Sequence, residues 1–259
     1  MSPGNSFRRL ISAELDNARD ASSQPVRRLI ICTSPRTAGH AMNEALMCAD
    51  WGVPTEYFNP EWMIPLQQRW LNANIIDPEM AMKNAKPYGE ALLKYRVRSN
   101  IFSAKIFPNQ LKGMLRTFGT NDRSGSYVHL VRRDKVAQAI SFAVLLLTKR
   151  AFDDDFELQY LPTLESLNDN AMRNLFVWLR SNDEFWEKHL KHIDGQRVIK
   201  IFSEDFLDNP SLYLHRIATR FSFPLDAIDL SSIGQGAYQK DADLKAELSQ
   251  RYTTLLKSL

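Results

Sequence analysis

Apolar and β-branched residues of this chain gather in four short runs, separated by segments with a helical spacing of apolar positions. The run at residues 28–33 is almost continuously apolar, which is typical of a strand buried on both faces. Residues 127–131 and 198–202 form two similar runs, and residues 102–107 form a weaker one. We therefore expect four strands at these positions.

Four segments carry apolar residues at the spacing of one helix face. They are residues 41–49, 135–147, 164–191 and 211–221. Because helices alternate with strands along the chain, we expect an α/β fold with a central, mostly parallel sheet flanked by helices. Pro54, Pro60 and Pro65 indicate an irregular region, and residues 121–126 (Asn-Asp-Arg-Ser-Gly-Ser) indicate a turn.

The domain organisation follows from length and from the position of the first strand. A chain of 259 residues fits one large domain. We expect residues 27–259 to form it, with a helical excursion at about 153–194, and residues 1–26 to be an N-terminal extension. Phe7, Leu10, Ile11 and Leu15 of this extension have the spacing of one side of a short amphipathic helix.

Composition excludes several classes of protein. A hydrophobic content of 44% and a charged content of 24% are those of a globular chain. The net charge, 33 basic minus 30 acidic residues, is +3, which is too balanced for nucleic-acid binding by bulk electrostatics. Two cysteines exclude a disulfide scaffold and a multi-thiolate metal site. The sequence contains neither a transmembrane run of about 20 apolar residues nor a signal peptide, so we expect a cytoplasmic protein.

The first candidate site is the loop between the first strand and the helix that follows it. Small residues that open a helix present free backbone N–H groups to one point, which suits an anion. Arg36, Thr37 and His40 add side-chain donors there. The loop lacks the lysine and the glycine spacing of a Walker A motif. The alternative is an ordinary strand-to-helix turn capped by Ser34 or Thr37.

The second candidate site is at the end of the strand at 127–131. Arg132 and Arg133 stand where a nucleotide hydrolase usually carries an acid that binds magnesium. Arginines there favour direct binding of a phosphate through charge-assisted hydrogen bonds. Ser141 follows nine residues after Arg132, about two helical turns into the next helix. The alternative is a solvated surface patch of the charged residues 132–135.

Taken together, these segments resemble the bacterial carbohydrate sulfotransferases of the trehalose 2-sulfotransferase type. Five segments of the family's pattern occur in the expected order: residues 34–40 (SPRTAGH), 54–58 (PTEYF), 103–110 (SAKIFPNQ), 132–142 (RRDKVAQAISF) and 202–210 (FSEDFLDNP). One departure is in the loop, where the family has Gly and then Ser or Thr and this chain has Ala38, Gly39 and His40.

The resemblance implies a fold, a donor and roles for individual residues. The fold would be a three-layer, P-loop-like domain, and the donor 3'-phosphoadenosine-5'-phosphosulfate (PAPS), with no metal required. The residues that would bind the 5'-phosphosulfate are Ser34, Arg36, Thr37, Ala38, Gly39 and His40. Arg132 and Ser141 would bind the 3'-phosphate. The acceptor would be a hydroxyl of a carbohydrate or a glycolipid, and relatives often form homodimers.

The resemblance also implies the two catalytic residues. Glu56 would be the general base that takes the proton of the acceptor hydroxyl, and Lys105 would lie beside the transferring group. The alternatives are a surface carboxylate for Glu56 and a strand-end lysine paired with a carboxylate for Lys105. Near the C-terminus, Gln239, Lys240 and Lys245 match the family only thinly, and we expect a solvated helix start there.

Two other functions compete with a sulfotransferase. The altered loop at Ala38 is compatible with a non-catalytic protein that binds phosphoadenosine nucleotides. A P-loop nucleotide kinase is the other alternative, and the missing Walker lysine argues against it.

Overall fold

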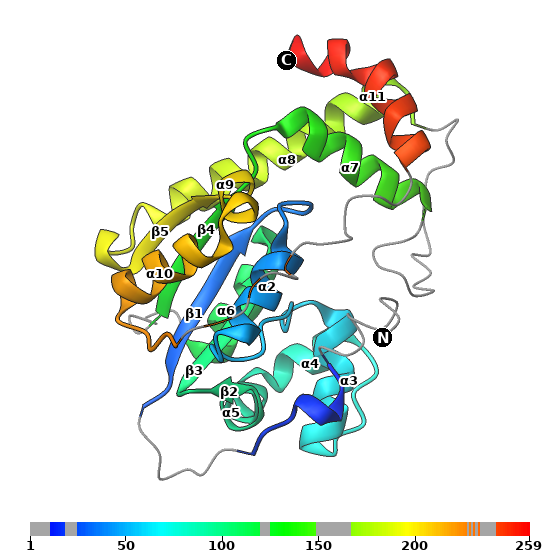
Figure 1. The fold of residues 1–259 in the computed structure, drawn as a ribbon. Helices are drawn as coiled ribbons and strands as arrows, with labels where there is room; N and C mark the ends of the chain where they lie inside the picture. The colour runs from blue at the N-terminus through cyan, green and yellow to red at the C-terminus, as the bar shows by residue number, and fades with distance from the viewer. Residues whose placement is uncertain are drawn as a thin grey trace.

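The computed structural model describes residues 11–18, 25–119, 125–148, 167–226, 228, 230, 233 and 242–259. Its centre is a five-stranded sheet with the strand order β2-β3-β1-β4-β5 (Figure 1). The strands are β1 (Arg27–Thr33), β2 (Val97–Arg98), β3 (Ile101–Ile106), β4 (Gly125–Val131) and β5 (Val198–Phe202). All neighbouring strands are parallel except β2, which pairs antiparallel with β3.

The four expected strands are confirmed to within two residues at each end. β1 lies in the middle of the sheet, and its residues 29–33 are fully buried, as the continuous apolar run predicts. β2 was not expected, because two residues are too short to produce a hydrophobic pattern.

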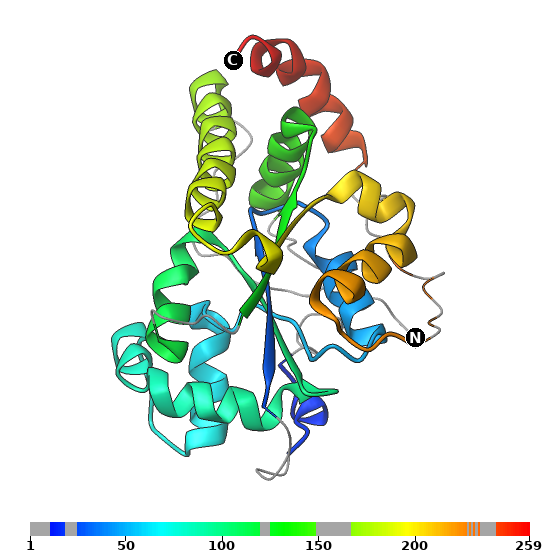
Figure 2. The same cartoon turned by 90° about the vertical axis from the view of Figure 1, so that its left-hand side faces the viewer.

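Side chains of β1 alternate between two hydrophobic layers. Leu29 and Ile31 point to one face of the sheet, where α2 (Gly39–Cys48), α9 (Ser203–Asp208) and α10 (Pro210–Phe221) pack. Ile30 and Cys32 point to the other face. That face is covered by α3 (Pro60–Leu71), α4 (Pro78–Lys83), α5 (Ala85–Tyr95) and α6 (Leu111–Phe118). Figure 2 shows the two helical layers on opposite sides of the sheet. The expected α/β fold with a mostly parallel sheet and flanking helices is confirmed.

A third helical cluster stands beyond the carboxyl ends of the strands. It consists of α7 (Lys135–Thr148), α8 (Asp169–Leu190) and α11 (Ala242–Lys257), which share a hydrophobic core of their own (Figures 1 and 2). The helices expected at 135–147 and 211–221 are confirmed to within one residue as α7 and α10, and the helix expected at 41–49 is α2. The helix expected at 164–191 is α8, although residues 164–166 lie outside the described residues.

The proline-rich region is irregular only in part: Pro54 lies outside helices and strands, as expected, whereas Pro60 and Pro65 belong to α3. Pro60 is the first residue of α3, where its missing N–H costs nothing, and the Asn59 side chain caps the helix by accepting from the Glu61 N–H at 3.2 Å. Pro65 lies inside α3. Because proline has no N–H, the Glu61 carbonyl, four residues before Pro65, lacks its helical hydrogen-bond donor. Both residues are exposed, so water can bind this carbonyl.

The expected turn at 121–126 is also partly wrong. Gly125 and Ser126 already belong to β4, where they pair with β1, and residues 121–124 lie outside the described residues. Gly125 and Ser126 are residue types that favour turns, but their pairing with β1 overrides this local preference and makes them the start of a strand.

Part of the N-terminal extension docks on the domain. Ala13–Leu15 form a short 3₁₀ helix, η2, and Ile11 and Leu15 pack against Val53 and Trp62. Phe7 and Leu10 of the expected amphipathic helix lie outside the described residues. Among the helices that the structure describes, none combines the length and the apolar character that a membrane span requires.

His129 of β4 makes folding stability depend on pH. Its side chain is buried, its Nε2 atom has no hydrogen-bond partner, and burial lowers its pKa to about 4. Between pH 6.5 and 4 the unfolded chain therefore binds a proton at His129 that the folded chain does not. Its contribution to the unfolding free energy is complete above about pH 6.5 and decreases as the pH falls.

We expect the His129 share of this loss to be about 2–3 kcal/mol at pH 4.5. Urea denaturation gives the free energy of unfolding of the wild type and of His129→Gln at pH 7.5 and at pH 4.5. The loss between the two pH values should be larger in the wild type, and the difference between the two losses is the share of His129. His215→Gln, at an exposed position of α10, is the matched control and retains the wild-type pH effect. Equal pH effects in the wild type and in His129→Gln would contradict this assignment.

Candidate active site

The candidate site lies at the carboxyl ends of three neighbouring strands. The loop at 34–38 follows β1, Lys105 is the second-last residue of β3, and Arg132 follows β4 directly. Because β1 lies between β3 and β4, the strand order reverses at β1, and the carboxyl end of such a strand is the topological switch point at which α/β folds bind ligands.

The loop after β1 presents the beginning of α2 to the site. Arg36 (φ 65°) and Ala38 (φ 55°) have left-handed backbone conformations. Ala38 is the N-cap of α2, and its side chain offers no oxygen to the first N–H groups of the helix. These N–H groups are therefore available to an anion. Glycine adopts the conformation of Ala38 more readily, which gives the family's preference at this position a physical reason.

Two predicted donor-binding side chains, Ser34 and Thr37, are engaged in shaping this loop. The Ser34 hydroxyl donates to Asp183 of α8 at 2.8 Å and accepts from the Gln138 amide at 3.0 Å. Thr37 donates to the Ser34 carbonyl at 2.9 Å. Lys135 forms an ion pair with the same Asp183. The loop is thus tied to α7 and α8.

The two candidate sites of the sequence meet in space. The Arg36 Nε donates to Ser141 Oγ at 3.0 Å, and the Arg132 Nη1 donates to the Arg36 carbonyl at 3.3 Å. Lys245 of α11 joins them: burial, together with Arg132 and Arg36, lowers the pKa of its ammonium. Neither Arg132 nor Lys245 forms an ion pair with a carboxylate of the described residues. Three cations and a hydroxyl therefore face one location.

Lys245 is the residue of this cluster that the sequence analysis missed. We expected a solvated helix start at its position, and Lys245 in α11 is instead partly buried and within electrostatic range of Arg132 and Arg36. Gln239 and Lys240 lie outside the described residues. The only signal for Lys245 in the sequence was the thin match to the family near the C-terminus.

Arg133 lies away from this cluster. Its guanidinium pairs with the Asp205 carboxylate and stacks over the Phe202 ring, with 4.0 Å from Cζ to the ring centroid. Its backbone N–H donates to Glu204 at 3.0 Å. Of the charged residues 132–135, Arg133 and Asp134 are exposed, as the surface-patch alternative requires, whereas Arg132 and Lys135 are partly buried.

Glu56 is held beside Lys105 because the segment at 51–56 runs along β3. The Lys105 N–H donates to the Thr55 carbonyl at 3.0 Å, and Ser103 donates to the Trp51 carbonyl. Gly52 (φ 84°) permits this close approach, since a Cβ there would lie 2.8 Å from the Ile101 carbonyl oxygen.

The two side chains form an ion pair, with 3.0 Å between Lys105 Nζ and Glu56 Oε1, and both are nearly buried. Gln110 Nε2 donates to Glu56 Oε2 at 3.3 Å, and Asn59 Nδ2 donates to the same oxygen at 3.4 Å. The side-chain oxygen Oε1 of Gln110 accepts from the Phe107 N–H, so the N–H₂ group of the same side chain faces Glu56. Glu56 is therefore no surface carboxylate.

Lys105 also connects this pair to the loop after β1. A Cβ added at Gly39 would lie 3.0 Å from Lys105 Cδ and 3.5 Å from its Nζ, so the absence of a side chain lets the lysine lie against the loop. Burial holds the pKa of the His40 imidazole well below its usual value, and the positive charges of Lys105 and Arg36 lower it further. His40 is therefore neutral at pH 7. The predicted residues thus form one continuous site, with Glu56 and Lys105 at one end and the three cations at the other.

Comparisons with known proteins identify the fold. No family model matches the chain, and no curated protein matches it in sequence. The sulfotransferase domain of the olefin synthase from Synechococcus PCC 7002 has a TM-score of 0.50 and 13% identity, over 93% of this chain and 98% of that one. Sulfotransferase STF9 from Mycobacterium avium has a TM-score of 0.49 and 14% identity, over 90% of this chain and 69% of that one. Mouse sulfotransferase SULT7A1, solved in complex with PAP, has a TM-score of 0.45 and 14% identity, over 96% and 70%.

At these identities the likeness concerns the fold. The chain has the P-loop-like sulfotransferase fold. The narrower resemblance to the trehalose sulfotransferase type stays a prediction. Among the described residues, no group of three His, Cys, Asp or Glu side chains is placed to hold a metal ion.

Proposed function

We propose that the protein transfers a sulfuryl group from PAPS to a hydroxyl of a small acceptor. The observation that carries this proposal is the single site formed by two distant segments of the chain. Arg36 and Ser141 are joined by a hydrogen bond, and Arg132 donates to the backbone of the same loop. The sulfotransferase fold agrees with this function.

The charged groups of the site fit a nucleotide with phosphates at two positions. Arg132, Lys245 and the Ser141 hydroxyl would bind the 3'-phosphate, because forked cationic donors suit a phosphate dianion. The N–H groups at the start of α2, with Arg36 and neutral His40, would bind the 5'-phosphosulfate. Ser34 and Thr37 would act on the same group by fixing the loop.

The other end of the site fits the acceptor. The bound donor supplies the electrophilic sulfuryl group. Glu56 would accept the proton of the acceptor hydroxyl, and Lys105, between Glu56 and the loop, would stabilise negative charge on the donor side. A carbohydrate or a glycolipid remains the acceptor class that the sequence resemblance implies.

Arg132→Ala tests the donor site. We expect this substitution to weaken binding of adenosine 3',5'-bisphosphate (PAP) by about 2–4 kcal/mol, or roughly 30-fold to 1,000-fold, because it removes a charge-assisted hydrogen-bond donor. Isothermal titration calorimetry measures the affinity. Adenosine 5'-phosphate, which lacks the 3'-phosphate, should bind the wild type and Arg132→Ala equally.

Arg133→Ala is the matched control, since Arg133 is the adjacent arginine and pairs with Asp205 instead. It should leave the affinity for PAP unchanged. Equal affinities of the wild type for PAP and adenosine 5'-phosphate would overturn the 3'-phosphate assignment. Tight binding of PAP without sulfation of any hydroxyl acceptor would favour a non-catalytic nucleotide-binding protein.

A further inference from the structure

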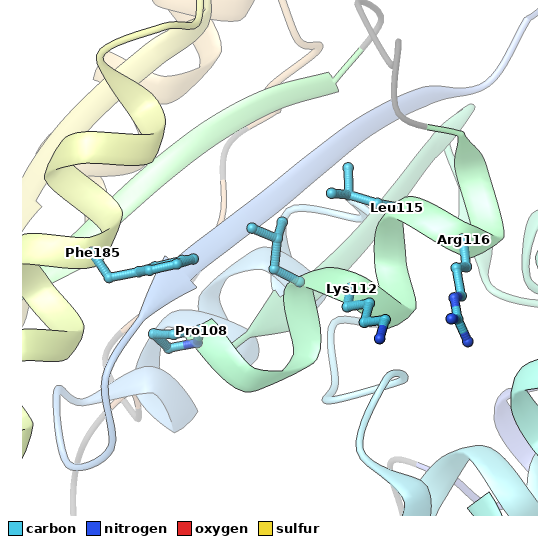
Figure 3. Close-up of a pocket in the computed structure, with 6 residues that line it drawn as sticks. Pro108, Lys112, Leu115, Arg116 and Phe185 are labelled. Atoms are coloured by element: carbon cyan, nitrogen blue, oxygen red, sulfur yellow. The ribbon is translucent and has the colours of Figure 1, made fainter. Parts of the chain in front are cut away.

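A groove runs along the outer face of α6 and begins at the candidate site. We call it the α6 groove; its volume is about 410 Å³, and it is lined by Pro108, Leu111, Lys112, Leu115, Arg116 and Phe185 (Figure 3). Five of these residues come from η3 (Pro108–Gln110) and α6, and Phe185 comes from α8. A volume of this size is within the range of sites for small molecules.

Pro108, Leu111 and Leu115 make the groove apolar, with Lys112 beside its middle and Arg116 at its far end (Figure 3). Pro108, Leu111 and Leu115 are spaced by three and four residues and therefore share one face. The ring of Phe185, which is 38% exposed, closes the end next to Pro108 (Figure 3). Lys112 and Arg116 are exposed, and neither forms an ion pair with a carboxylate in the described part of the chain.

The residues next in the chain to the Phe185 end of the groove contact the Glu56–Lys105 pair and the end of β1, although neither Glu56 nor Lys105 lines the groove. Gln110, between the lining residues Pro108 and Leu111, donates to Glu56 at 3.3 Å. The ring of Phe107, directly before Pro108, lies 5.5 Å from Lys105 Nζ. On the opposite wall, Trp186 follows Phe185 and donates to the Thr33 carbonyl at the end of β1. From Gln110 to Arg116, α6 extends about 9 Å away from this point.

We propose that the acceptor is an anionic amphiphile. Its hydroxyl would lie at Glu56, its hydrocarbon part in the α6 groove, and its anionic group at Lys112 and Arg116. This inference rests on the proposed sulfotransferase function. Charge complementarity selects this occupant, because two exposed cations along an apolar groove attract an anion attached to an apolar chain. A free carbohydrate offers such a groove much less apolar surface than a hydrocarbon chain does.

The test measures binding rather than turnover. Isothermal titration calorimetry with PAP present compares 6-hydroxyhexanoate, 8-hydroxyoctanoate and 10-hydroxydecanoate with the corresponding diols and with trehalose. We expect affinity to rise about tenfold for each two added methylene groups, since each is buried in the groove. The hydroxy acids should bind more tightly than the diols, and trehalose more weakly than both.

Variants of the groove identify its two parts. Leu115→Gln should weaken binding of 10-hydroxydecanoate about tenfold. The double variant Lys112→Glu/Arg116→Glu should remove the preference for the acid over the diol. Lys86→Glu, a charge reversal at an exposed position of α5, is the control and should change neither. Unchanged affinity for PAP shows that each variant is folded.

The outcomes separate this inference from the proposed function. The amphiphile proposal would be overturned if the affinity for the hydroxy acids did not depend on chain length, or if Leu115→Gln left that affinity unchanged. Binding of PAP would in that case still support a sulfotransferase. Failure of PAP to bind the wild type would overturn the sulfotransferase and, with it, the acceptor role of the groove. Tight binding of trehalose in place of the hydroxy acids would assign the site to a carbohydrate.

Discussion

Glu56→Gln is expected to lower turnover by about 10²–10⁴ while leaving the affinity for PAP nearly unchanged. Glutamine keeps the shape of the side chain and an oxygen that accepts from Lys105, but it cannot take a proton from the acceptor. The ion pair with Lys105 holds Oε1 of the wild-type carboxylate, and the hydrogen bonds from Gln110 and Asn59 hold Oε2. Steady-state sulfation of an acceptor hydroxyl, with PAP affinity measured in parallel, provides the check.

A nearby carboxylate serves as the matched control. Glu61, at the start of α3, is exposed, and Glu61→Gln should leave turnover within a factor of two or so of the wild type. Glu56→Asp, which keeps the charge but withdraws it by one methylene, should fall between the wild type and Glu56→Gln. Turnover of Glu56→Gln equal to that of Glu61→Gln would remove Glu56 from the mechanism.

Asp16→Asn is expected to lower the free energy of unfolding by about 3 kcal/mol. The Arg96 side chain is 0% exposed and pairs with Asp16 at 2.9 Å, and Arg69 and the Trp70 indole donate to the same carboxylate at 3.0 and 2.8 Å. Without the negative charge, the buried Arg96 guanidinium loses its counter-ion, and desolvation of the guanidinium is no longer compensated. Urea denaturation at pH 7 measures the change.

Removing the carboxylate from an exposed ion pair should cost far less free energy of unfolding than removing Asp16. Glu79 and Lys83 on α4 pair at 3.1 Å with side chains 82% and 72% exposed, so Glu79→Gln should cost less than about 0.5 kcal/mol. If Asp16→Asn costs no more than Glu79→Gln, the N-terminal extension does not contribute to the stability of the domain.

The central sheet could be predicted from the sequence because it is buried on both faces. Residues 29–32 of β1 are all apolar there, and such a run stands out without knowledge of its neighbours. The helices α3 to α6 were not predicted. α3 carries Pro60 and Pro65, and α4 and α6 have only 6 and 8 residues, so packing against the core, rather than a local pattern, determines these three helices.

The charged residues of the candidate site were predictable to different degrees. Arg132 directly follows β4, and Arg36 is in the loop three residues after β1 ends. Because parallel strands bring their carboxyl ends to one edge, the proximity of these two arginines follows from topology. Asp183 and Lys245 reach the site from long helices, where a charged residue looks like any solvated position. Only packing of α7, α8 and α11 on one another places these two side chains.

The three strands β3, β1 and β4 are hydrogen-bonded neighbours, and each leads into one part of the candidate site. The spacing of Lys105, the loop and Arg132 is thus set by the main chain of the sheet. The α6 groove, in contrast, is a helix surface whose side chains the sheet does not constrain. Under the proposed function, exchanging the exposed residues of α6 should therefore change the acceptor preference and leave the affinity for the nucleotide unchanged, which makes this helix the natural place to begin engineering.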